Sequence, residues 1–263
     1  MLFQHGDLVT RKSYNNDIIF KIEDIIDNDV ILTGINMRLC ADAKVEDLQI
    51  YETTENEKVE DDDTFFAKLN DDYSLDRNEY FYLPGRILHV DGDPEYLKRC
   101  LKFYKEGNVN VFGVHIKEDE MAETIIKHLH ELKPDILVIT GHDAYYRKRG
   151  TQEEPKLYKN TNNFIRTVQE ARKYEKAHDK LIIIAGACQS NYEGLIKAGA
   201  NFASSPKRVN IHALDPAIIA LTVSLSDKGK DIDLLGILGK TKYGASGVGG
   251  LITKGTMYIG YPR

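Results

Sequence analysis

The chain has 263 residues, enough to bury a core and to form one main domain with a small appendage. Its net charge of −6, with lysines scattered among acidic residues, excludes the basic surface that a nucleic acid partner needs. The three cysteines, Cys40, Cys100 and Cys188, fit no metal-binding spacing, so we expect no cofactor and a reducing, intracellular compartment. We also expect no secretion signal and no membrane span, because no apolar run approaches the roughly 20 residues required.

The N-terminal part is expected to form a separate small unit. Residues 1–51 alternate short apolar runs with turn signals such as Asn15-Asn16 and Asn28-Asp29. This spacing predicts a small SH3-like β-barrel, which either binds a partner protein or only packs on the main domain. Residues 52–83 follow and are mainly acidic up to Glu79, so they predict a solvated linker.

Residues 84–263 alternate between strand and helix patterns. Short apolar runs at 87–90, 135–140 and 181–184 are separated by stretches with helical periodicity. Asp93 and Pro94 suit the N-cap and the first position of the first helix. Regular alternation of this kind predicts a mainly parallel, flavodoxin-like α/β sheet with helices on both faces.

The stretch Leu181 to Ser190, LIIIAGACQS, places a cysteine at a strand end. Its apolar run predicts a buried strand, and the small residues after it allow a turn that leaves Cys188 where open α/β sheets carry their chemistry. Ser190 and Glu193 have capping-box spacing, so we expect a helix to begin directly after Cys188 and to favour its thiolate. The alternative is a buried, inert cysteine.

A histidine stands at the same edge of the predicted sheet. The strand Ile136 to Thr140 ends in Gly141 and His142, and 188 − 142 = 46 residues leave room for one loop and one helix. A thiol and a base on one edge predict catalysis with Cys188 as nucleophile and His142 as base. The backbone N–H of Cys188 is one expected oxyanion donor, and Gly141 and Asp143 are candidates for the second.

Other histidines and cysteines have weaker cases. His212 follows the next strand and is the main rival to His142 as the base. His89 and His115 lie within strand patterns and are expected to be structural. Cys40 and Cys100 fall in the predicted barrel and on the apolar face of a helix, so both are expected in the core.

The order of these residues resembles a known class of peptidases. A histidine at one strand end, followed by an Ala-Cys pair at the next, resembles the caspase-like (clan CD) peptidases. Those enzymes usually have His-Gly where this chain has His142-Asp143. Longer blocks, namely LHVDGDPEYLKRCL, PDILVITGHDAY, AGACQS and GANFASSPKRVNIHALDP, resemble the YabG family of sporulation-specific peptidases over nearly the whole chain.

This resemblance implies a fold, an activity and a site. It implies a caspase-like cysteine endopeptidase that processes spore coat and cortex-related precursor proteins in the mother-cell cytoplasm, at the forming spore coat. His142 and Cys188 carry over as its dyad, and the residues indicate no third member. We further expect self-cleavage in the acidic linker or at its edge, at Arg77 or Arg86. The oligomeric state stays open.

The resemblance also leads to a prediction of specificity. In the caspase-like fold the first specificity pocket is lined by strand ends, and here the first strand ends in Asp91-Gly92-Asp93. A carboxylate at this place can hold a guanidinium through two hydrogen bonds, so we predict cleavage after arginine. Asp93 has a capping duty and Asp91 has none, so Asp91 is the better candidate. Ser204 and Ser205 are further candidates for substrate binding.

Two non-catalytic functions are the alternatives. A flavodoxin-like sheet could bind a phosphorylated ligand through Ser204, Ser205 and the glycines of YGASGVGG, although no G-x-G-x-x-G fingerprint or P-loop follows the first strand. A scaffold could instead recruit coat proteins through the N-terminal barrel. Neither protein would cleave its partner.

Overall fold

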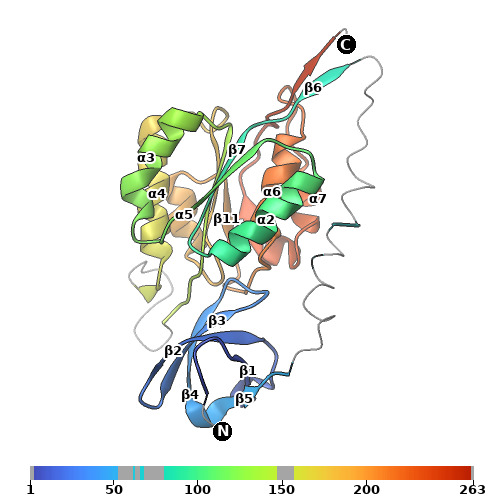
Figure 1. Cartoon of the computed structure of the whole chain (residues 1–263). Coiled ribbons are helices and arrows are strands. Elements are labelled where there is room, and N and C mark those ends of the chain that lie inside the picture. Colours follow the sequence, from blue (N-terminus) through green and yellow to red (C-terminus); the bar gives the residue numbers. More distant parts are fainter. Residues whose placement is uncertain (1–2, 53–61, 63–65, 68–79, 147–156, 262–263) are drawn as a thin grey trace.

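The structure is a computed structural model that describes residues 3–52, 62, 66–67, 80–146 and 157–261. Most of the predicted linker, residues 52–83, lies outside the described residues. Figure 1 shows the N-terminal sheet lying beneath the central sheet.

The N-terminal sheet is antiparallel and has the strand order β4-β3-β2-β1-β5. Its strands are β1 (Leu8–Arg11), β2 (Phe20–Ile26), β3 (Asp29–Gly34), β4 (Cys40–Lys44) and β5 (Leu48–Ile50), with 3₁₀ turns at Lys12–Tyr14 and Val45–Asp47. The predicted SH3-like barrel is not shown, because β4 and β5 are the two edges and the described strands form no closed barrel. The apolar face is covered instead by the main domain, since Cys188 and Ile211 pack into the same cluster as Val9 and Phe20.

The central sheet is mainly parallel, as predicted, with the order β12-β11-β10-β9-β7-β8. Its strands are β7 (Ile87–Asp91), β8 (Val111–His115), β9 (Ile136–Thr140), β10 (Ile182–Ala185), β11 (Phe202–Ser204) and β12 (Val248–Gly250). Only β12 runs antiparallel to its neighbour. The first five strands have the order 2-1-3-4-5 of a doubly wound sheet, in which ligands bind at the carboxyl ends of the strands.

Helices cover both faces of this sheet (Figure 1). One face carries α2 (Pro94–Glu106), α6 (Asp215–Ser224) and α7 (Leu234–Gly239), and the other carries α3 (Met121–Leu132), α4 (Thr161–Tyr174) and α5 (Tyr192–Ala198). A separate two-stranded sheet joins β6 (Phe81–Leu83) to β13 (Tyr258–Gly260), and a 3₁₀ turn lies at Gly244–Ser246. None of the helices in the described part of the chain is long and apolar enough to cross a bilayer.

The helix starts beside the strand ends differ in how well the sequence predicts them. Asp93 caps α2 as predicted, and its side chain accepts hydrogen bonds from the N–H groups of Glu95 and Tyr96. The predicted capping box at Ser190 is wrong, because Asn191 caps α5 and the helix begins only at Tyr192. The Ser190 hydroxyl accepts the N–H of Ala187 instead, and therefore stabilises the turn around Cys188.

Candidate active site

The predicted site residues lie where the N-terminal sheet meets the carboxyl edge of the central sheet (Figure 1). Asp91 ends β7, His142 follows β9 by two residues and Cys188 follows β10 by three. The connection between β3 and β4 lies against this edge, since Leu39 forms a bridge to Asp143. Residues from both sheets therefore build the site.

His142 has one ring nitrogen bonded and the other free. Its Nε2 lies 2.7 Å from Asp93 Oδ2, and its Nδ1 is buried without a hydrogen-bond partner among the described residues. A carboxylate only accepts hydrogen bonds, so Nε2 carries the proton and a neutral ring has its lone pair on Nδ1. Burial, the largest single effect, would raise the pKa of Asp93, but the hydrogen bond and charge of His142 and the N–H of Tyr96 together outweigh it, and the pKa lies below its ordinary value.

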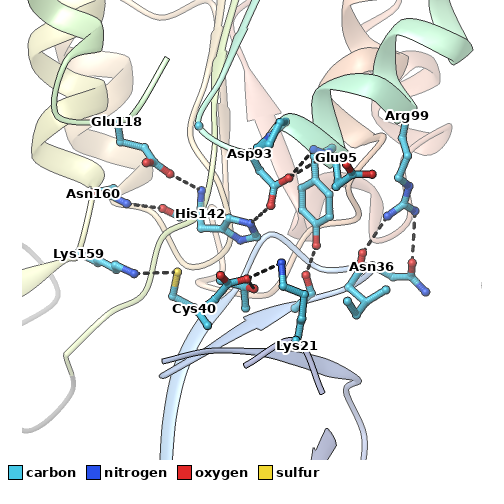
Figure 2. A pocket seen from close by; sticks show the side chains of 18 of the residues that line it. Lys21, Asn36, Cys40, Asp93, Glu95, Arg99, Glu118, His142, Lys159 and Asn160 are labelled. Atoms are coloured by element: carbon cyan, nitrogen blue, oxygen red, sulfur yellow. Dashed lines mark hydrogen bonds and ion pairs between the residues drawn. The ribbon is translucent and has the colours of Figure 1, made fainter. Parts of the chain in front are cut away.

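The backbone around His142 is fixed by two further side chains. The Glu118 carboxylate accepts the N–H of His142 at 3.0 Å, and the Asn160 amide donates to its carbonyl at 2.8 Å (Figure 2). Gly141 leaves room for this contact, because a Cβ there would lie 2.4 Å from Glu118 Oε1. The ring of His142 also lies 5.0 Å from the ring of Tyr96.

Cys188 is fully buried in a sharp turn. Gly186 has φ = +104°, a conformation that side chains disfavour, and it begins this turn. The thiol lies against the main chain of Ile211, whose N–H it accepts at 3.1 Å and whose carbonyl lies 3.5 Å away. Burial raises the pKa of the Cys188 thiol, contrary to the expectation of a favoured thiolate. The helix α5 does not begin directly after Cys188 but at Tyr192.

Asp143 connects the two strand ends. Its Oδ2 accepts the hydroxyls of Thr161 at 2.5 Å and Ser190 at 2.8 Å, and its Oδ1 accepts the N–H of Asn160 at 2.8 Å. Burial raises the pKa of this carboxyl, although all these hydrogen bonds oppose the rise. Asp143 therefore positions the turn of Cys188 relative to the neighbouring His142.

An arginine from the N-terminal sheet fills the pocket beside Asp91. Arg38 lies between β3 and β4 and is fully buried. Its Nη1 lies 3.1 Å from Asp91 Oδ1 and its Nη2 lies 2.9 Å from Oδ2, which is a two-pronged ion pair. The guanidinium also donates to the carbonyl of Ala213 through Nε and Nη2, and the ring of Tyr96 lies 4.8 Å from its central carbon.

The floor of this pocket is formed by His89, Asp91 and Cys100, whose donor atoms lie within 4.8 Å of one another. Such a group could hold a metal ion, but here the guanidinium of Arg38 bonds to both Asp91 and the Cys100 sulfur. Burial, the largest single effect, would raise the pKa of Asp91, but the charges and hydrogen bonds of Arg38 and His89 together outweigh it, so the pKa lies well below its ordinary value. The sequence suggested that Asp91 has no structural role. The structure shows that it has one, because it pairs with the buried Arg38.

The carbonyl of Arg38 joins the turn of Cys188 to the residue that follows His142. Its oxygen accepts the backbone N–H of Cys188 at 3.2 Å and that of Asp143 at 3.4 Å. Two N–H groups converging on one carbonyl oxygen form the arrangement of an oxyanion hole. They come from Cys188 itself and from the residue after His142.

Other residues singled out from the sequence lie apart from this carbonyl. Ser204 is buried in β11, and the Ser205 hydroxyl accepts the N–H of Gln189 at 2.9 Å and donates to the carbonyl of Val209. No hydrogen bond within the described ranges joins either serine to Arg38. His212 is buried, with its Nδ1 accepting the N–H of Leu214 and its Nε2 4.0 Å from Asp62.

A cavity of about 1220 Å³ opens beside His142 and is lined by both domains (Figure 2). Asn36 and Cys40 line it from the N-terminal sheet, and Asp93 and Lys159 line it from the main domain. Cys40 is buried as predicted, and its sulfur lies 3.2 Å from Lys159 Nζ. The cavity is large enough to take a segment of polypeptide beside His142.

Comparison with known proteins places this chain. A family model described as YabG peptidase U57 matches residues 4–262. The chain belongs to this family. It is 42% identical over 286 residues to the sporulation-specific protease YabG of Bacillus subtilis (strain 168), covering 100% of this chain and 99% of the relative. No solved structure matches it. As a member of the YabG family the chain is a peptidase, and its substrates are proteins.

Proposed function

We propose that this peptidase is a caspase-like cysteine endopeptidase that cuts after arginine. The observation that carries the proposal is the place of Arg38, with its carbonyl between two N–H groups and its guanidinium on Asp91. Its likeness to the Bacillus subtilis protease favours a role in sporulation, with spore coat and cortex-related precursors as substrates in the mother cell.

Cys188 is the nucleophile and His142 is the base in this proposal. The unpartnered Nδ1 of His142 takes the thiol proton as Sγ turns from Ile211 and attacks the carbonyl carbon before the cut. Asp93 acts as a positioning residue, because its hydrogen bond to Nε2 keeps the lone pair on Nδ1. It also stabilises the imidazolium that forms.

The rest of the reaction uses the same groups. The carbonyl electrons move to oxygen, which the N–H groups of Cys188 and Asp143 stabilise. The C–N bond then breaks, and His142 gives its proton to the leaving amine. Water, losing a proton to His142, attacks the thioester, releases the new carboxyl end and restores the thiol.

Asp91 selects arginine in this proposal. Its two oxygens match the fork of a guanidinium, and each charge-assisted hydrogen bond is worth about 1.5–3 kcal/mol. Lysine offers a single ammonium, which lacks the planar fork of parallel N–H groups that matches the two oxygens. The carbonyl of Ala213 accepts a further pair of N–H groups and adds to the preference.

The test is cleavage of candidate coat precursors by wild type and Cys188→Ala, with mass spectrometry of the new termini. Wild type is expected to produce fragments ending in arginine, and Cys188→Ala none. A folded Cys188→Ala protein that still cleaves would refute the mechanism. Binding of the precursors without new termini would favour a scaffold.

A further inference from the structure

The connection between β3 and β4 lies on the main domain as a bound peptide would. Arg38 N–H donates to the carbonyl of Ile211 at 3.3 Å, and Ala213 N–H donates to the carbonyl of Asn36 at 3.1 Å. Between these bonds Met37 forms an antiparallel bridge with His212. Addition of a segment to exposed main chain is a general mode of peptide recognition, with side-chain pockets giving the specificity.

Two side chains of α2 hold this connection in place. The Tyr96 hydroxyl lies 2.9 Å from the carbonyl of Met37 and also bonds to that of Gly34. Arg99 donates to the carbonyl of Ile35 at 2.8 Å and lies 3.3 Å from the Asn36 side-chain oxygen (Figure 2). Main chain and side chains of residues 34–38 are thus bound by the peptidase domain itself.

We propose that the bond between Arg38 and Leu39 is the first cleavage site of this peptidase, cut within the same molecule, and that the uncut connection closes the site to other proteins. The proposal rests on the proposed function, and it deepens it by naming a substrate. Arg38 is the residue before the cut, because its carbonyl carbon is the one whose oxygen bonds to Cys188 and Asp143.

The chemical step is balanced without a co-reactant other than water. Cys188 Sγ forms a thioester with Arg38 as the bond to Leu39 nitrogen breaks, and the thiol proton passes through His142 to that amine. Water then hydrolyses the thioester and leaves a carboxylate on Arg38. The products are residues 1–38 and residues 39–263.

The uncut enzyme is expected to have low activity rather than none. The thiol lies against Ile211, and burial raises its pKa, so little thiolate is present before the connection moves. A tethered segment has an effective concentration near 1 mM, far above that of a free substrate. If the connection binds the site with a dissociation constant of about 10 μM, the uncut enzyme should hydrolyse other substrates roughly 100-fold more slowly than the cut enzyme.

The cut itself is expected to open the site. Leu39 is 4% exposed and packs in the apolar cluster with Cys188, where a newly formed ammonium group is unfavourable. The new end must therefore leave the cluster and uncover the thiol. Pairing of β3 with β4 from Asp29↔Lys44 to Thr33↔Cys40 still holds the two products together.

The cleavage sites expected from the sequence differ from this one. Arg77 lies outside the described residues. Arg86 precedes β7, at the opposite edge of the sheet from Cys188, and its carbonyl accepts the N–H groups of Asp135 and Ile136. A cut at Arg86 would therefore need a second molecule, whereas Arg38 is already seated.

The experiment follows freshly purified full-length wild type and Cys188→Ala by intact mass and N-terminal sequencing, while a short arginyl peptide reports activity. Wild type should acquire a new N-terminus at Leu39 with a first-order rate that is independent of protein concentration. Peptide hydrolysis should rise by roughly 100-fold in parallel. Cys188→Ala should stay intact, and both wild-type products should elute together under native conditions.

Two matched variants complete the test. Arg38→Lys keeps a positive charge opposite Asp91. It should slow self-cleavage about 10- to 100-fold, which corresponds to the loss of one charge-assisted hydrogen bond. Arg86→Lys, the same change at the linker edge, should leave it unchanged. Peptide cleavage with an intact Arg38–Leu39 bond overturns the inference but not the proposed function. Failure to cut either substrate overturns both, and a rate proportional to protein concentration overturns cleavage within one molecule.

Discussion

The pairing of Asp91 with Arg38 can be tested as a free energy of unfolding. Both side chains are fully buried, and their atoms lie 3.1 and 2.9 Å apart in two bonds. Asp91→Asn removes the negative charge and leaves a guanidinium buried without its counter-ion. Breaking a buried pair from one side costs about 3–5 kcal/mol, a large share of the total stability of a domain.

The assay is urea unfolding at neutral pH in a Cys188→Ala background, where self-cleavage cannot interfere. Asp91→Asn and Arg38→Gln are each expected to lower the free energy of unfolding by about 3–5 kcal/mol. The double variant should lose much less than their sum, with a coupling of about 2–3 kcal/mol, because neither charge is then left alone. The pKa of Asp91 is lowered from its ordinary value of 3.8. The contribution of the ion pair to the free energy of unfolding is therefore fully present above pH 3.8 and is lost only as the pH falls through the lowered pKa.

The same change tests specificity in the active enzyme. Asp91→Asn should lower kcat/KM for arginyl peptides about 10- to 100-fold and leave the slow cleavage of glutaminyl peptides unchanged. Additivity of the two stability losses within about 0.5 kcal/mol would show that the residues do not interact. An unchanged ratio of arginyl to glutaminyl cleavage would refute Asp91 as the specificity residue.

The remaining predictions concern the base, its partner and the thiols. His142→Ala should lower kcat about 10²–10⁴-fold and His212→Ala should have little effect, and the reverse ranking in steady-state kinetics would move the base to His212. Asp93→Ser keeps an N-cap for α2, so the free energy of unfolding should change by less than about 0.5 kcal/mol while kcat falls at least about 10-fold. An unchanged kcat would show that Asp93 has no part in the mechanism. Burial raises the pKa of Cys40 to about 11 and of Cys100 to about 12, and also raises that of Cys188, so iodoacetamide at pH 8 should label all three slowly before self-cleavage. After self-cleavage, peptide mapping should show faster labelling of Cys188 but not of the other two cysteines. Rapid labelling of Cys188 in the uncut chain would contradict its burial.

The sequence predicts the central sheet well because its signals are local. Apolar runs such as Ile182 to Ile184, and the Asp93-Pro94 helix start, act through nearest neighbours and agree with the structure. The capping box at Ser190 is wrong for a tertiary reason, because its hydroxyl also donates to Asp143, 47 residues earlier in the chain. The barrel is not shown because the main domain supplies the apolar cover that a closed barrel would supply itself.

The part of the site that sequence reasoning missed depends on contacts between the two domains. Arg38 stands among Met37, Leu39 and Cys40, and an arginine in an apolar run is a weak signal of burial. Nothing in its neighbours indicates that it pairs with Asp91, 53 residues later. The hydrogen bond that His142 donates to Asp93 was missed for a different reason, because the N-cap role of Asp93 already accounted for that residue.

The seating of Arg38 has a consequence for chemical probes of this enzyme. A small arginine mimic with an electrophilic carbonyl needs the Asp91 pocket and the two N–H groups, and the chain already occupies all of them. Such a probe can bind only to molecules in which the connection between β3 and β4 has moved out of the site. The fraction of protein that it modifies covalently would therefore count the open molecules in a population, and labelling in sporulating cells would report when the enzyme becomes available rather than when it is made.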